Sequence, residues 1–228
     1  MPVTLYTFGA PRVGGYMFGH QFSHRFNSAN CHRVYHKTDP VPLVPLYPYM
    51  HAPLGELGHY LPSTHTLTSG RAHAMKSYIE SVEKNDGWSL LCARPEQPYT
   101  LEIGIEEWLK SKSPVNPASP TFWRWVDAAI IYVLKIVSVN ALHAVQFGLI
   151  GAFTLADKIA YFLEKGIAIG ESVSIWLERL MRKIMQAVGM SVAKGTKALT
   201  RGFMRFVLMR LTATANALAR AAIQKLNL

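Results

Sequence analysis

The sequence predicts an α/β fold followed by an all-α tail. In residues 1–110, short segments rich in β-branched and aromatic residues alternate with segments of helical spacing. A Pro- and Ser-rich linker occupies residues 111–120, and beyond it the chain has no proline and no strand-like segment. We therefore expect a partial α/β domain at residues 1–110, with a truncated parallel sheet, and a helical region at residues 121–228.

The elements of the α/β part follow from its local patterns. Strands are predicted at residues 2–8, 31–37 and 99–105, and helices at residues 16–26 and 72–84. Residues 40–63 contain six prolines and are predicted as loop, because proline interrupts both helices and sheet ladders. The glycines between the first strand and the first helix indicate a structural turn, since no Lys-Ser/Thr pair follows them as in a phosphate-binding loop.

Charge is distributed unevenly along the chain. Residues 1–114 hold ten Lys/Arg and nine Asp/Glu, whereas residues 115–228 hold fourteen and five. From Arg179 onward there are ten basic residues and no acidic one. The net charge of +10 therefore belongs almost wholly to the second half. The two cysteines, Cys31 and Cys92, have no metal-ligand spacing, and we expect two free thiols.

Two motifs in the first third carry specific chemistry. The first predicted strand runs into Phe8-Gly-Ala-Pro-Arg-Val-Gly14, and the second runs into Asp39-Pro-Val-Pro42. His73 then opens the helix that contains Tyr78. In this order and spacing, these features resemble the class 3 lipases, the fungal-type triacylglycerol lipases of the α/β-hydrolase fold. The resemblance covers residues 2–85 and says nothing about the tail.

The resemblance implies catalytic roles for two residues. Asp39 matches the carboxylate of a Ser-Asp-His triad and His73 matches its histidine. In such a triad the imidazole takes the serine proton, and the carboxylate fixes its tautomer and stabilises the imidazolium. The implied reaction is hydrolysis of carboxylic esters of glycerolipids or phospholipids through an acyl-serine. His65 is the rival for the base, and Asp39 before Pro40 also fits a plain turn cap.

The remaining polar residues of this part have simpler interpretations. His51 and Glu56 are expected to shape the loop beside the active site. The four histidines at 51, 59, 65 and 73 have no helix-face spacing, and no carboxylate or cysteine stands at ligand spacing to them. We therefore expect no metal and no cofactor.

The sequence lacks the motif that normally carries the nucleophilic serine of the triad. A Gly-x-Ser-x-Gly elbow is absent from the sequence, and Gly189-Met-Ser191-Val-Ala193 is a degenerate match after the histidine, where the α/β-hydrolase order does not place it. We expect the serine and its oxyanion donors in an upstream segment, which leaves this chain inactive alone. The strand at 2–8 would then expose an open edge.

The tail has two segments that favour membrane contact. Residues 128–155 are strongly apolar but are interrupted by Lys135, so a membrane-spanning helix would begin at Ile136. Trp123 and Trp125 resemble interfacial anchors. Residues 178–226 form a basic amphipathic pattern suited to an anionic membrane surface. A helical bundle with a solvated basic face explains the same pattern. No nucleic-acid-binding motif appears.

The prediction is therefore a membrane-associated protein, peripheral or single-span, carrying the acid and base of a class 3 lipase. The alternative is a non-catalytic, membrane-associated helical protein with a relic lipase segment. In a third arrangement, another chain supplies the missing half.

Overall fold

The computed structural model describes residues 3–56, 58–84, 102–137, 155–167, 171–191 and 199–224. The chain divides into two compact units. The first comprises Met1–Pro98, Ala118–Pro120 and Ala215–Leu228, and the second comprises Tyr99–Pro117 and Thr121–Thr214. The predicted boundary at the Pro/Ser-rich linker stays a prediction.

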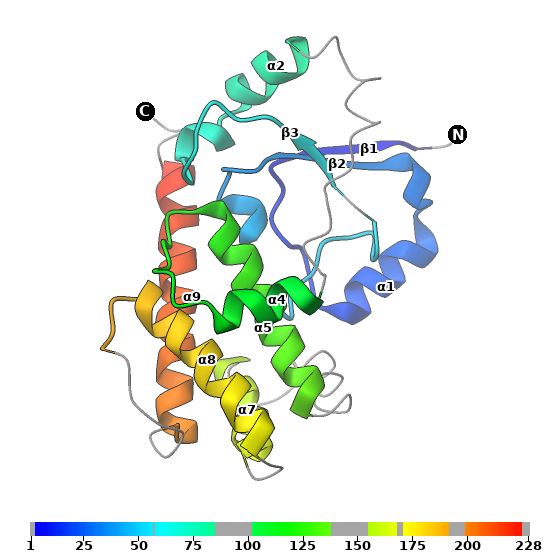
Figure 1. Cartoon of the computed structure of the whole chain (residues 1–228). Coiled ribbons are helices and arrows are strands. Elements are labelled where there is room, and N and C mark those ends of the chain that lie inside the picture. Colours follow the sequence, from blue (N-terminus) through cyan, green and yellow to red (C-terminus); the bar gives the residue numbers. More distant parts are fainter. Residues whose placement is uncertain are drawn as a thin grey trace. The chain divides into compact units, whose positions relative to one another are not determined.

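A small parallel sheet forms the centre of the first unit. Its strands are β1 (Leu5–Phe8), β2 (Cys31–His36) and β3 (His59–Leu61), in the order β1-β2-β3 (Figure 1). Both pairings are parallel. The carboxyl ends of β1 and β2 therefore meet at the same edge of the sheet, where α/β proteins place their functional loops. The structure confirms the two predicted strands of this part of the chain.

β3 lies in the segment that was predicted as loop, and that prediction is wrong for these residues. A three-residue strand between prolines is too short to display a period-2 pattern. It forms because Leu61 is fully buried in a core cluster with Val34 and Tyr78, against which Phe8 and Val82 also pack.

In the described residues up to Lys84, two helices accompany this sheet. They are α1 (Tyr16–Arg25) and α2 (Met75–Glu83), and both confirm the predicted helices. Three short 3₁₀ turns connect the elements: η1 (Ser28–Asn30), η2 (Val41–Leu43) and η3 (Gly70–His73). α2 places Tyr78 in the core of the sheet, and η3 immediately before it carries His73.

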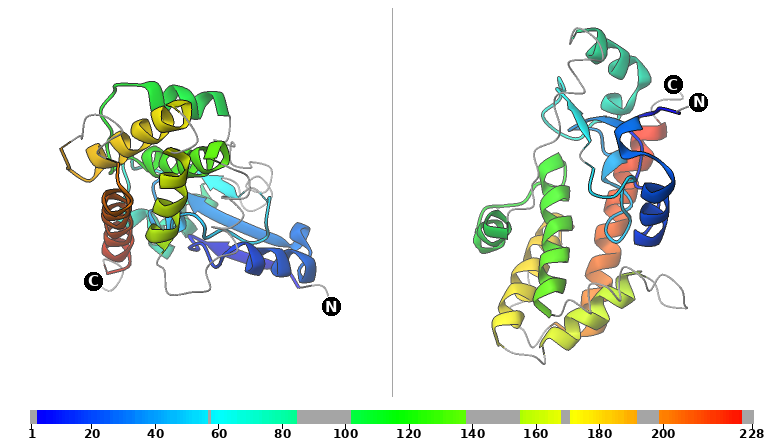
Figure 2. Two further views of the ribbon diagram at one scale, coloured as in Figure 1. Left: turned by 90° about the horizontal axis from the view of Figure 1, so that it is seen from below. Right: turned by 90° about the vertical axis from the view of Figure 1, so that its right-hand side faces the viewer.

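The second unit is helical. In the part of the chain that the structure describes, the helices after the sheet are α4 (Glu102–Lys110), α5 (Pro120–Val137), α7 (Leu155–Ile167), α8 (Glu171–Ala187) and α9 (Arg201–Gln224). From Ala215 onward, α9 belongs to the first unit. Within the unit, α8 contacts both α4 and α7 (Figure 2). In the described part of the chain after Pro120, every regular element is a helix, as predicted.

The predicted strand at 99–105 is wrong where the structure describes it. Residues 102–105 begin α4, and residues 99–101 lie outside the described ranges. Ile105 and Leu109 are four residues apart and both buried, which is the spacing of one helix face. The strand was predicted from the short alternating pattern of residues 99–105, which does not extend far enough to show this helical spacing.

Several other predictions fall outside the described residues. These are the thiol of Cys92, the apolar stretch 138–154, and residues 192–198 and 225–226 of the basic tail. Cys31 is a buried free thiol, as expected. Among the helices that the structure describes, α9 is long and apolar enough to cross a membrane by length and composition alone, which is weak evidence for a span.

Candidate active site

Asp39 stands in the tight turn that follows β2. Its backbone N–H donates to the carbonyl of His36 at 3.1 Å, and its Oδ1 accepts from the backbone N–H of Val41 at 2.9 Å. The residue is 1% exposed. One carboxylate oxygen thus caps the turn, which keeps the side chain in one orientation and leaves Oδ2 for other partners.

Oδ2 of Asp39 receives two side chains. Nδ1 of His73, in η3, lies 2.9 Å from it, and the hydroxyl of Tyr78, in α2, donates to it at 2.6 Å. The Asp39 side chain is 0% exposed and that of His73 is 17% exposed. Because a carboxylate only accepts, Nδ1 of His73 carries the proton, and Nε2 is the nitrogen of the neutral ring that takes one up.

Tyr78 links the carboxylate to the end of β2. Its hydroxyl oxygen accepts from the backbone N–H of His36 at 3.2 Å while donating to Asp39. Burial first, and then the charge and hydrogen bond of Asp39, raise the pKa of Tyr78 far above its usual range. The phenol therefore stays protonated and remains a donor. Its ring stacks on His36 at 4.2 Å and meets Phe8 edge-on.

Gly9 ends β1 directly against this cluster. Its φ is +62°, and its backbone N–H donates to the carbonyl of Val34 at 2.9 Å. A Cβ added there would lie 2.6 Å from Oδ2 of Asp39 and 2.9 Å from both Nδ1 of His73 and the hydroxyl of Tyr78. Only a residue without a side chain lets the first motif approach the carboxylate so closely.

The other sequence-predicted residues lie around this centre without joining it. Nε2 of His51 is 3.0 Å from the carbonyl of Pro42, and the carbonyl of Glu56 accepts from Arg33. The imidazole bonded to Asp39 is His73, whereas His65 lines a neighbouring cavity. Within the residues described, no three His, Cys, Asp or Glu side chains are arranged to hold a metal ion.

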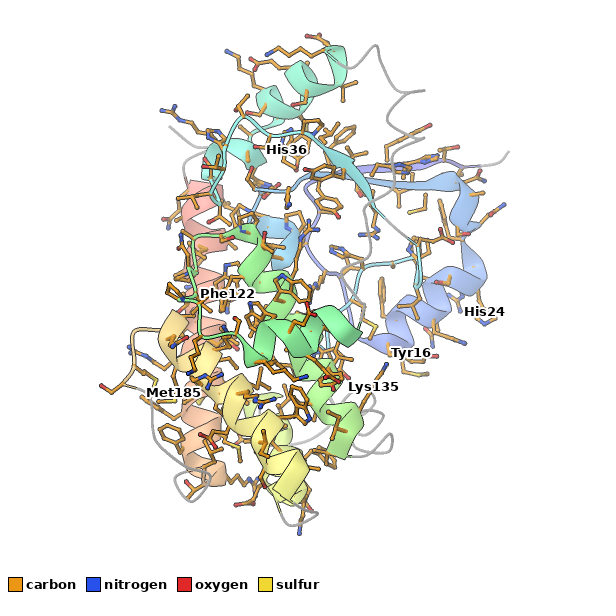
Figure 3. The ribbon with its side chains drawn as sticks, in the orientation of Figure 1. Tyr16, His24, His36, Phe122, Lys135 and Met185 are labelled. Atoms are coloured by element: carbon orange, nitrogen blue, oxygen red, sulfur yellow. The ribbon has the colours of Figure 1, made fainter. Side chains whose placement is uncertain are left out.

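Sequence reasoning missed two contributors near the site. The sequence motifs include Tyr78 without a role of its own, and they place His36 only within the second predicted strand. His36, labelled in Figure 3, is 2% exposed. Its Nδ1 lies 2.7 Å from the carbonyl oxygen of Ala72, and its Nε2 lies 2.9 Å from Oγ of Ser81.

One protein family matches the first part of the chain. Residues 1–48 match the family model for lipase (class 3), which confirms the predicted family over that stretch. The matched residues include β1, Gly9, β2 and Asp39, and they end before His73. No curated protein and no solved structure matches the chain. The family match supports a lipase-type ester hydrolase in general, and the small parallel sheet with its helices is consistent with part of an α/β fold.

Proposed function

We propose that this chain supplies the acid and base of a serine hydrolase that cleaves carboxylic esters of lipids. The observation that carries the proposal is the 2.9 Å contact between Nδ1 of His73 and Oδ2 of the buried Asp39, which lies within the stretch that matches class 3 lipases. His73 rather than His65 is the base, since it is the imidazole that reaches the carboxylate.

The chemistry follows from the orientation of the pair. Nε2 of His73 takes the proton of a serine hydroxyl as its oxygen attacks the ester carbonyl carbon. The carboxylate of Asp39 stabilises the imidazolium that forms. His73 then gives the proton to the departing alcohol, and water removes the acyl group from the serine by the same route. Tyr78 and the Val41 N–H keep the carboxylate in place throughout.

The serine itself is proposed to come from a segment outside these 228 residues. This part of the proposal rests on the absence of a Gly-x-Ser-x-Gly elbow from the sequence. The segment belongs either to a longer form of the same protein or to a second chain. We expect no lipid-ester turnover through His73 from the present chain alone.

The test is labelling with a fluorophosphonate, followed by mass spectrometry of the modified peptide. A longer protein that includes the upstream reading frame is expected to label at an elbow serine, with the label lost in His73→Ala and strongly reduced in Asp39→Asn. Serine labelling in the present chain that requires His73 would place the nucleophile within it and contradict the external serine. Absence of His73-dependent labelling in the longer protein would support the non-catalytic alternative instead.

We further infer that the tail brings the site to an anionic membrane surface. The support is the exposed side of α9, which carries Phe206 and Met209 between Arg205 and Arg210. An apolar strip flanked by arginines is the pattern of interfacial helices. The lipid esters that a lipase-type hydrolase cleaves are located at such surfaces.

A further inference from the structure

We propose that Ser81 and His36 form a second nucleophile–base pair, which reacts with short-chain carboxylic esters in a cavity of its own. Oγ of Ser81, on α2, lies 2.9 Å from Nε2 of His36, at the end of β2. The pair does not use the contact between Asp39 and His73, and neither of those residues lines the cavity. The proposal is therefore independent of the lipase site.

The hydrogen bonds of His36 fix its role. Nδ1 lies 2.7 Å from the carbonyl oxygen of Ala72, which only accepts, so Nδ1 carries the ring proton. In the neutral ring, Nε2 is then an acceptor, and the hydroxyl of Ser81 donates to it. This is the arrangement that a histidine needs to remove a serine proton, with a backbone carbonyl in the place of the usual carboxylate.

Burial keeps this imidazole in its basic form. His36 is 2% exposed, and its pKa is lowered chiefly by burial and less by His65, against the opposing effects of the Ala72 hydrogen bond and Asp39. A neutral imidazole at neutral pH accepts a proton. Ser81 is only partly buried, so the nucleophile is more accessible than its base.

The cavity limits what reaches the pair. It has a volume of about 210 Å³ and is formed by His36, the segment 62–65, Ala72 and one side of α2 (Figure 3 labels His36). Pockets for drug-sized ligands span roughly 300–1,000 Å³. A cavity of this size favours a short acyl group. Lys84 and Glu80 also line the cavity, and the ammonium of Lys84 supplies positive charge for a developing oxyanion.

The reaction balances without any further reagent. Oγ of Ser81 bonds to the carbonyl carbon of the ester while its proton passes to Nε2 of His36. The bond from that carbon to the alcohol oxygen breaks, and the alcohol leaves with the proton. Ser81 is left as an acyl ester, which water hydrolyses with His36 again as the base.

The first test uses the purified 228-residue chain and a small fluorophosphonate. Label is expected on the tryptic peptide 77–84, and fragmentation must place it on Ser81 rather than Ser77. Ser81→Ala should abolish it, and His36→Gln should slow it at least about tenfold, as expected when a general base is lost. Ser77→Ala is the matched control, because the Ser77 hydroxyl donates to the carbonyl of Arg71 and not to an imidazole.

A second measurement does not require a change at the buried histidine. In Ser81→Cys, the thiol stands beside Nε2 of His36 and should react with iodoacetamide at neutral pH at least about tenfold faster than the thiol of Ser77→Cys, because an adjacent imidazole favours the thiolate. Equal rates for the two cysteines would overturn the pair. So would a folded chain without label on Ser81, or a label that requires His73 and not His36.

Discussion

The hydrogen-bond donors around Asp39 explain how the fold offsets the free energy that is needed to remove this carboxylate from water. Buried charges are tolerated in proteins when hydrogen bonds replace their hydration. Asp39 receives donors from Val41, His73 and Tyr78, on two different oxygens. Each donor comes from a different element, so one side chain connects η2, η3 and α2.

Replacing Tyr78 with phenylalanine is expected to destabilise the fold and loosen the pair. The change removes a 2.6 Å donor from a carboxylate that is 0% exposed. Hydrogen bonds to charged groups contribute about 1.5–3 kcal/mol, so we expect a loss of that order in the free energy of unfolding, measured by urea denaturation. Tyr161→Phe, at a tyrosine that is 40% exposed, serves as the control and should change it by less than about 0.5 kcal/mol. Equal losses would contradict the role of the Tyr78 hydroxyl.

Gly9→Ala is expected to be more costly than an ordinary glycine substitution. The alanine would combine a positive φ with contacts of 2.6–2.9 Å to Asp39, His73 and Tyr78. Gly55 has a similar φ of +79° with nothing within 4 Å of an added Cβ, so Gly55→Ala isolates the backbone strain, about 1–3 kcal/mol. Denaturant unfolding should show the larger loss for Gly9→Ala. If the two losses are the same, the close approach of Gly9 to Asp39 and His73 does not add to the cost of the substitution.

His36 should make stability depend on pH. Its folded pKa lies below the ordinary value of 6.5, chiefly because of burial, so the unfolded chain binds this proton more tightly. The contribution of neutral His36 is complete above the unfolded pKa and is lost as the pH falls from there towards the folded pKa, with at most about 1.4 kcal/mol per pH unit. Urea unfolding at about pH 7.5 and about pH 5.5 measures the loss. His36→Gln should reduce the difference, and an unchanged difference would assign it to other groups.

At the scale of elements, the sequence predicted what local periodicity encodes. β1, β2, α1 and α2 have clear patterns, and both motifs of the site end a strand or open a helix. β3 and α4 were missed because their stability comes from partners that are distant in sequence: Leu61 packs with Val34 and Tyr78. Asp39 and His73 were predicted from a resemblance. The roles of Tyr78 and His36 depend on tertiary contacts, which no spacing in one chain specifies.

The residues that follow α4 make another tertiary contact that the spacing of residues in the sequence does not predict. Lys183 of α8 is 1% exposed, and its ammonium donates to Oγ of Ser111 at 2.8 Å and to the carbonyl of Ser113 at 3.3 Å. The ammonium also lies over the ring of Trp108, 5.3 Å from its centroid. Burial lowers its pKa, with a smaller effect from Arg182.

Two substitutions separate the charge of Lys183 from its aliphatic stem. Lys183→Met keeps an aliphatic side chain of similar length and removes a buried charge, so we expect the free energy of unfolding to change by less than about 1 kcal/mol. Lys183→Ala also loses the packing of the stem and should cost about 2 kcal/mol. Both are measured by urea denaturation. If Lys183→Met is as damaging as Lys183→Ala, the ammonium and its hydrogen bonds dominate.

At the scale of the whole molecule, charge and chemistry are divided along the chain. The candidate site lies in the nearly neutral first half, and the positive charge in the second. α9 contains four arginines and no acidic residue, and its exposed side includes Phe206 at 52% and Met209 at 47% exposure. Arg205 is paired with Asp157 at 2.6 Å, so Arg210 and Arg220 are the better residues to alter.

Co-sedimentation with liposomes tests whether α9 binds an anionic membrane. The chain should bind vesicles that contain phosphatidylserine and bind neutral phosphatidylcholine vesicles much more weakly. Each basic residue near an anionic surface contributes about 1 kcal/mol, so the double variant Arg210→Gln, Arg220→Gln should reduce the partition coefficient roughly thirtyfold. Phe206→Ala should reduce binding to both kinds of vesicle, and Thr214→Ala is the matched neutral control. Binding that survives the arginine changes but is lost in Phe206→Ala would indicate apolar insertion, and no binding by the unaltered chain would favour a helical bundle with a solvated basic face.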